Sequence, residues 1–149
     1  ILIRENDECD LLCKETKFSN KKMIKDFLII NFIWKNDKIG LRIKKNFFIH
    51  NFQNKLQNNE ILVKSILDLL KKHKVNIDKD FSILINSGPG SFSSIRVALA
   101  VAKGIRISKK VSLFGFKNSD LSDFSLENIE FLIKKNLIEK NLIKPLYLS

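Results

Sequence analysis

Three short hydrophobic runs lie between residues 27 and 52, each with its own pattern. Residues 27–34 are apolar and β-branched, residues 38–45 alternate between apolar and basic side chains, and residues 47–52 are largely aromatic. These runs predict three strands, and the polar break at residues 35–38 predicts a hairpin turn between the first two. The alternation along residues 38–45 also predicts that one face of the second strand is in water.

Longer segments show helical spacing instead. Residues 54–74 carry apolar side chains on one side of a helix, with Ile61 as the exception and lysines in the last turn. His73 falls in this apolar stripe, where a half-buried structural histidine is favoured over a catalytic one. A second helix is predicted at residues 92–107 and helical spacing continues at residues 126–137. The apolar side of the first helix consists of Leu56, Leu62, Val63, Ile66, Leu67, Leu69 and Leu70.

Two further apolar runs, residues 81–86 and 111–116, each follow a predicted helix and are predicted to be strands. The resulting order is βββαβαβ, with three antiparallel strands first and crossover helices afterwards. This order predicts an α/β domain with a mixed sheet and helices packed on it.

The loop between the fourth strand and the second helix contains Gly88, Pro89 and Gly90. Two glycines around a proline form a tight turn, and such a turn before a helix N-terminus can hold an anion. The lysine of a G-x-x-x-x-G-K-[ST] loop and the Rossmann G-x-G-x-x-G pattern are both absent here. A structural loop capped by Ser91 or Ser93 is therefore favoured, with an anion cradle as the alternative.

The second helix has an unusually wide apolar surface. Arg96, Lys103 and Arg106 share a narrow polar sector, and most of the remaining circumference is apolar. A one-sided surface helix shows an apolar arc of roughly 100°, so this helix needs a neighbour besides the sheet. The small residues Ala98 and Ala102 leave room for a facing helix, which is either the chain's own first helix or a partner's.

Residues 88–104 resemble GPGSFTG-(L/V)-R-(I/V)-GLA-x-AKG, the signature of TsaB-type proteins, with departures at Ser93, Ser94 and Ala98. The segment Pro145-Leu146-Tyr147-Leu148 resembles the end of the same proteins. The resemblance implies a ribonuclease H/actin-like (ASKHA) half-domain at residues 23–116. Only 33 residues follow Phe116, so residues 117–149 are expected to be a short remnant of a largely missing second subdomain. Residues 1–22 precede Met23 without periodicity, and we expect a poorly ordered extension there.

TsaB-type proteins are pseudoenzyme subunits of the machinery that makes threonylcarbamoyladenosine on tRNA. The resemblance implies that this chain is a non-catalytic scaffold that binds and activates a TsaD-like transferase. It also implies a TsaE-like ATPase as a further partner, tRNA contact only through the complex, and a homodimer as an alternative assembly. No membrane partner is expected.

The resemblance places the partner interface on the two helices, within residues 59–70 and 95–105. The implied interface residues are Leu62, Ile66, Leu70, Ile95, Ala98, Leu99, Ala102 and Ile105. The implied signature loop consists of Gly88, Pro89, Gly90, Ser91, Phe92 and Arg96.

Catalytic and metal-binding patterns are weak in this sequence. Actin-like ATPases need an aspartate at the end of the first strand, where this chain has Asn31, and His50 and His73 are too far apart for an H-x-x-x-H pair. Cys9 and Cys13 have no second ligand pair, so we expect no metal, no cofactor and no catalytic residue. An actin-like nucleotide hydrolase or a peptidase of the glycoprotease family is the alternative. A direct RNA-binding module is a third option, which the lysine-rich body permits although the sequence shows no interleaving of aromatic and basic residues like that of an RNA-recognition motif.

Composition adds little to this picture. The chain is 44% hydrophobic, with a net charge of +11. Residues 1–22 contain five basic and five acidic residues, so the whole excess belongs to residues 23–149. Such a basic body favours RNA or an acidic protein as a partner, and lysine-rich codon usage explains it equally well. The two thiols, without a signal peptide or an apolar run of about 20 residues, fit a reducing cytoplasm.

Overall fold

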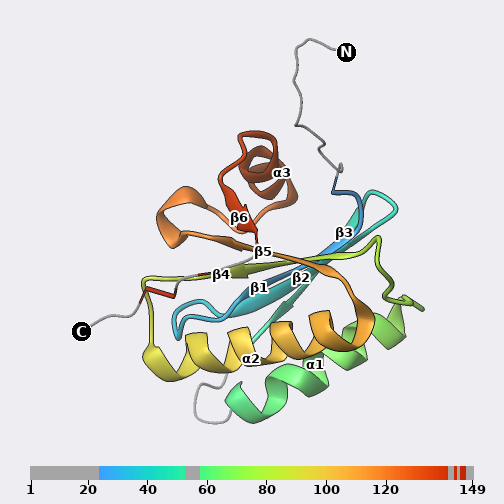
Figure 1. Ribbon diagram of the computed structural model, residues 1–149, viewed down its shortest axis with the longest axis horizontal. Helices are drawn as coiled ribbons and strands as arrows, with labels where there is room; N and C mark the ends of the chain where they lie inside the picture. Colours follow the sequence, from blue (N-terminus) through green and yellow to red (C-terminus); the bar gives the residue numbers. More distant parts are fainter. Residues whose placement is uncertain (1–23, 53–57, 141–142, 144, 147–149) are drawn as a thin grey trace.

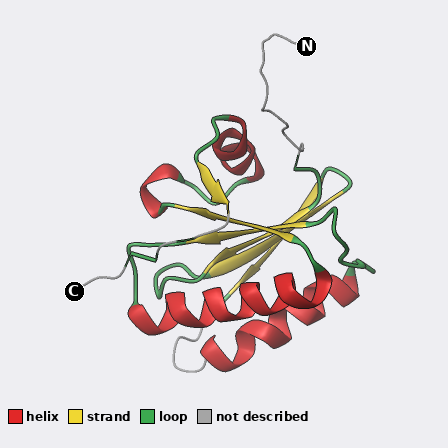
Figure 2. Cartoon of the chain, in the orientation of Figure 1, coloured by secondary structure: helices red, strands yellow, loops and turns green. Residues whose placement is uncertain are grey.

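A computed structural model describes residues 24–52, 58–140, 143, 145 and 146. They form a six-stranded mixed sheet in the order β3-β2-β1-β4-β5-β6, with helices on both faces (Figures 1 and 2). In chain order the elements are β1 (Phe27–Asn31), β2 (Lys38–Ile43), β3 (Asn46–Asn51), α1 (Asn58–Lys72), β4 (Ser82–Asn86), α2 (Phe92–Lys109), β5 (Ser112–Phe116), the 3-10 helix η1 (Asn118–Asp120), α3 (Leu126–Lys134) and β6 (Ile138–Lys140).

The sheet confirms the predicted βββαβαβ order and the α/β fold class. Strand β1 pairs antiparallel with β2 and parallel with β4, and β4 is parallel to β5. Helices α1 and α2 form the two crossovers and lie together on one face of the sheet (Figure 1). The C-terminal ends of β1, β4 and β5 therefore meet at the same end of the sheet.

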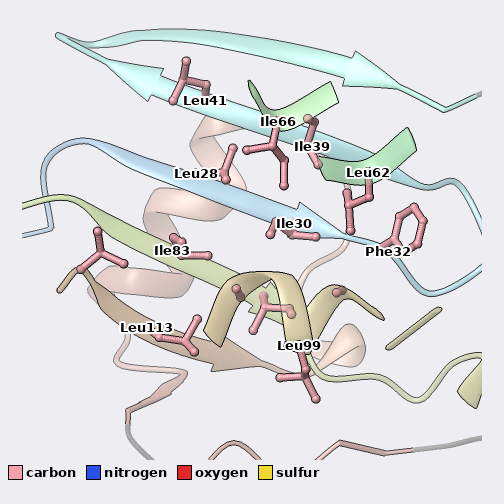
Figure 3. Packing of buried hydrophobic residues seen from close by; sticks show 14 of the residues in the cluster. Leu28, Ile30, Phe32, Ile39, Leu41, Leu62, Ile66, Ile83, Leu99 and Leu113 are labelled. Atoms are coloured by element: carbon pink, nitrogen blue, oxygen red, sulfur yellow. The ribbon is translucent and has the colours of Figure 1, made fainter. Parts of the chain in front are cut away.

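The larger core lies between the sheet and the helices α1 and α2. Because side chains alternate along a strand, Leu28 and Ile30 of β1 point to this face, together with Ile83 of β4. They meet Leu62 and Ile66 of α1 in one buried cluster (Figure 3). Helix α1 thus forms part of the layer over β1 and β2.

Helix α3 covers the other face of the sheet. Phe27 and Ile29, the alternate residues of β1, pack there with Phe116 and with Ile129 and Leu132 of α3. Both faces of the central strands are consequently buried, and every residue of β1 and of β4 is classed as buried.

The prediction that β2 has one face in water is wrong. Ile39 and Leu41 are buried in the larger core, and Gly40 on the opposite face is buried as well, because the Phe47 ring lies directly over it. Arg42, one of the basic positions of the alternation, is not in open water either. Its guanidinium contacts the backbone carbonyl of Lys25 and forms an ion pair with Glu130 of α3 (3.4 Å).

Several element boundaries differ from the sequence-based prediction. Strand β1 ends at Asn31 rather than at residue 34, because the chain turns at once, with φ of 77° at Trp34 and 54° at Asn36. Helix α2 continues two residues beyond the predicted end, to Lys109. Strand β6 was not predicted at all. Residues 1–22, Leu56, Tyr147 and Leu148 lie outside the described residues, so the predictions made for them stay predictions.

Candidate functional site

The glycine loop joins β4 to α2 and is held by backbone hydrogen bonds. The Gly88 N–H donates to the side-chain oxygen of Asn86 (2.8 Å), and the Gly90 N–H donates to the carbonyl of Leu146 (3.1 Å). The Ser91 N–H donates to the carbonyl of Ile33 (3.2 Å). These three amides, which would face an anion in a phosphate cradle, are therefore used within the chain.

Both glycines of the loop are required by close backbone contacts. Gly88 has a φ of 106°, and a Cβ there would collide with the carbonyl oxygen of Leu146. A Cβ on Gly90 would lie 2.6 Å from the Cβ of Ile33. The Leu146 N–H also donates to the Ser87 carbonyl (2.7 Å), so Leu146 is hydrogen-bonded to the loop through both its N–H and its carbonyl. These contacts support a structural role for the loop rather than a role in binding an anion.

The remaining residues of the signature loop lie at its surface. Pro89 is exposed, and Phe92 is 52% exposed with the guanidinium of Arg96 4.8 Å from the centre of its ring. Ser91 is the N-cap of α2, but its side chain makes no capping hydrogen bond and instead lies 3.4 Å from the hydroxyl of Ser93. The expected side-chain cap is thus absent.

Three asparagines cluster at the C-terminal ends of the parallel strands. The Asn86 side-chain NH₂ donates to the side-chain oxygen of Asn31 (2.6 Å) and to that of Asn118 (3.1 Å). The Asn31 NH₂ donates to the carbonyl of Asn36 (3.1 Å). At the position where actin-like ATPases need a carboxylate, this chain has a hydrogen-bonded amide network without formal charge, in which Asn31 and Asn86 are buried and Asn118 is exposed.

The eight residues predicted for a partner interface lie in or against the chain's own core. Seven of them, Leu62, Ile66, Leu70, Ile95, Ala98, Leu99 and Ala102, are between 0% and 8% exposed, and Ile105 packs half-buried against the same cluster. The sheet and the contact between α1 and α2 bury these side chains, so they are not available to a partner in this conformation. This corrects the residue assignment.

Other residues of the same helices form their outer surfaces. On α1, Val63 and Leu67 are 45% and 59% exposed and lie four residues apart, on one side of the helix. On α2, Ile107 is 75% exposed, and Ala100 and Gly104 are exposed on the same side. A Cβ added at Gly104 would meet no atom within 4 Å.

Within residues 24–52 and 58–140 no three His, Cys, Asp or Glu side chains are grouped in a way that could hold a metal ion. Across that same part of the chain, no helix is both long enough and apolar enough to cross a membrane. His50 and His73, too far apart in sequence to form a pair, each contact a phenylalanine ring instead.

Comparison with known proteins finds one similar curated sequence and similar solved structures. The tRNA threonylcarbamoyladenosine biosynthesis protein TsaB of Buchnera aphidicola subsp. Baizongia pistaciae (strain Bp) is 42% identical over 60 residues, 39% of this chain and 27% of that protein. The matched part of the chain is similar to a TsaB protein. No protein-family model matches the sequence.

Two solved structures share the fold of this chain. YeaZ from Pseudomonas aeruginosa superposes with a TM-score of 0.58 and 17% identity, over 76% of this chain and 51% of that one. An uncharacterized protein described as similar to peptidase YEAZ from the same organism gives a TM-score of 0.58 and 18% identity, over 63% of this chain and 44% of that one. The chain therefore spans about a quarter of the curated relative and about half of each of these two structures.

Sequence reasoning found Asn31 but missed Asn86 and Asn118. The signal was present, because Asn86 ends the apolar run of β4 just as Asn31 ends that of β1. Since the two strands are parallel neighbours, their last residues lie at the same end of the sheet. Asn118 gives no comparable signal, because it begins the short helix η1, two residues beyond β5.

Proposed function

We propose that this chain is a non-catalytic subunit in the synthesis of threonylcarbamoyladenosine on tRNA, and that it binds and activates a TsaD-like transferase. The relative that carries the name of this process is 42% identical over 60 residues, and the folds of the YeaZ structures agree with it. We further propose that the transferase binds the outer surfaces of α1 and α2. A TsaE-like ATPase and tRNA join the assembly through the transferase.

One observation carries the interface proposal: the exposed side of α2 has small apolar positions, with the basic side chains of Arg96 and Lys103 beside them. Ala100 and Gly104 are exposed four residues apart, with Ile107 beyond them and open space above Gly104. Small residues at this spacing let a second helix approach closely, since its ridge fits the groove they leave. Leu67 adds an exposed apolar contact on α1. A helix pair from a partner would cover about 800 Å² of this chain, as in a standard stable interface.

The non-catalytic role is supported by the asparagine cluster. A nucleotide hydrolase of the actin type needs a carboxylate to handle the metal-bound phosphates, and the cluster has amide groups that are already hydrogen-bonded to one another. The amides of the glycine loop are also used within the chain. No observation in the described residues favours the hydrolase or the peptidase over the scaffold.

The interface proposal is tested by placing charges on the two outer surfaces. The variants Leu67→Glu and Ile107→Glu replace exposed side chains, so the fold is expected to persist while the affinity for the TsaD-like transferase falls at least about tenfold, equal to ~1.4 kcal/mol. Calorimetric titration with the transferase of the same source measures this change.

Phe131→Glu is the matched control. Phe131 is 54% exposed on α3, on the opposite face of the sheet, and its replacement is expected to leave the affinity unchanged. Full affinity in both helix variants would contradict the proposed interface. A homodimer through the same surfaces would appear as a doubled mass in light scattering, and Ile107→Glu is then expected to make it monomeric.

A further inference from the structure

A pocket of about 350 Å³ lies where the β2–β3 hairpin meets the segment that follows α1. Lys44 and Phe48 line it from the hairpin, and His73, Lys74 and Val75 line it from the other side. The hairpin turn is next to the start of β1, because Arg42 pairs with Phe27. The pocket is therefore at the opposite end of the sheet from the asparagine cluster and the glycine loop.

The walls of the pocket combine rings and aliphatic side chains. The Phe48 and His73 rings are stacked at a centroid distance of 3.7 Å and an interplanar angle of 20°. Ile43 and Val75 contribute apolar surface beside them. This ring pair is a rigid wall against which a planar group can pack.

The rim of the pocket carries positive charge. Lys44 and Lys74 line it. Lys45, next to Lys44 in the sequence, and Lys71, three residues before Lys74, are also exposed. Asp26 is the carboxylate in the lining, and it accepts a hydrogen bond from the Lys44 N–H (3.1 Å). The lysines of the rim outnumber this carboxylate, which makes the pocket attractive to an anion.

The hairpin turn keeps lysines where turn chemistry favours other residues. Lys44 and Lys45 both have positive φ, 49° and 73°, as at the two central positions of a tight hairpin turn. Asparagine and glycine are favoured at such positions, and asparagine is common in this chain. Both turn positions therefore hold lysines instead of residues that would favour the turn more, and Lys44 adds its positive charge to the pocket lining.

We infer that this pocket binds a single-stranded RNA segment, with phosphates on Lys44 and Lys74 and one unstacked base beside the Phe48–His73 pair. Single-strand sites combine a basic rim that follows the backbone with aromatic side chains that contact a base. A duplex offers the phosphates but keeps its bases stacked inside. This inference goes beyond the proposed function, in which RNA is reached only through the complex, and it depends on different residues.

Fluorescence anisotropy of the full chain with a labelled oligo-uridine strand of about twelve nucleotides tests the inference. We expect binding that weakens as salt rises from about 50 to about 200 mM. The double variant Lys44→Ala/Lys74→Ala is expected to bind at least about tenfold more weakly and to reduce the slope of log affinity against log salt by about 1.4, since each lost phosphate contact contributes roughly 0.7.

The control Lys35→Ala/Lys117→Ala removes the same charge from exposed positions at the opposite end of the sheet and is expected to bind the strand like the unchanged chain. Phe48→Leu keeps the charge and removes the ring. It is expected to weaken binding about tenfold with an unchanged salt slope, and a thermal melt shows whether it is folded.

Three results would overturn the inference: no binding at about 50 mM salt, equal loss in both double variants, or a duplex of the same length binding as tightly as the strand. Equal loss would show that only the overall charge matters, and duplex binding would show that no base enters the pocket. Affinity for the TsaD-like transferase, measured on the same variants, separates this test from that of the proposed function. The pocket variants are expected to retain that affinity.

Discussion

At the scale of single residues, the asparagines at the C-terminal ends of the parallel strands act as one hydrogen-bonded unit. The Asn86 side chain uses both N–H groups and its oxygen, joining Asn31, Asn118 and the Gly88 amide. A buried polar side chain satisfied in this way costs little, whereas a buried partner left without its hydrogen bond costs about 1–3 kcal/mol. This cost applies to the buried Asn31 and Asn86 and not to the exposed Asn118. The network therefore fixes the start of the glycine loop.

The same network leads to a prediction about nucleotide binding. Because its amides are neutral and already paired, we expect the isolated chain to bind Mg-ATP weakly at most and not to hydrolyse it. Calorimetric titration and a phosphate-release assay measure the two properties. Sub-micromolar affinity, or turnover that Asn31→Ala abolishes, would contradict the scaffold function and favour the actin-like hydrolase.

Two alanines of α2 that lie two residues apart should respond oppositely to the same substitution. Ala102 is 0% exposed within the larger core, so Ala102→Glu would bury a carboxylate without a partner, which costs several kcal/mol. We expect this variant to be unfolded, since a domain of this size has only about 5–15 kcal/mol of stability.

Ala100→Glu is the control for this substitution, because Ala100 is exposed on the other side of the helix. Circular dichroism should show a folded chain with a nearly unchanged melting temperature. A folded Ala102→Glu variant would mean that this side of α2 does not pack on the sheet.

At the scale of elements, hydrophobic periodicity predicted the strands and helices of the core but not which side of each helix is buried. On α1, Leu67 shares the apolar stripe with Leu62 and Ile66, yet it is 59% exposed while they lie against the sheet. The apolar arc was wider than the contact with the sheet, and only the docking angle of the helix decides which part is covered. The partner residues were misassigned for this reason.

Strand β6 is an element that hydrophobic periodicity does not predict. It has three residues, of which Glu139 and Lys140 are exposed, and so it has no hydrophobic pattern of its own. It exists because it pairs with β5, where Gly115 faces Glu139. Local sequence does not predict a strand that depends on tertiary pairing.

Helix α3 provides a prediction at this scale, because two adjacent residues differ in burial: Leu132 is buried and Phe131 is exposed. Leu132 is 0% exposed in the second core, so Leu132→Ala is expected to lower the free energy of unfolding by about 2–5 kcal/mol. Phe131→Ala next to it removes a side chain that is 54% exposed and should change stability by less than about 1 kcal/mol. Urea denaturation measures both, and equal losses would show that α3 does not pack as described.

At the scale of the whole molecule, the two cores lie on the two faces of one sheet and begin at the same strand. Leu28 and Ile30 belong to the larger core, and Phe27 and Ile29 belong to the smaller one. Just before β1, Ile24 packs against the smaller core and the Asp26 carboxylate accepts a hydrogen bond from the Lys44 N–H. Described residues from Ile24 onward thus contribute to the core and to the hydrogen bonds at its edge.

The last prediction follows from this arrangement and from the lack of periodicity in residues 1–22. A chain that starts at Met23 is expected to melt within a few degrees of the full chain, since ~1 kcal/mol corresponds to only a few degrees in a domain of this size. A chain that starts at Phe27 is the control: it loses Ile24, the Asp26 carboxylate and the Lys25 carbonyl that Arg42 contacts, and should melt clearly lower. Scanning calorimetry compares the three. A large drop already at Met23 would show that residues 1–22 contribute to the stability of the folded chain.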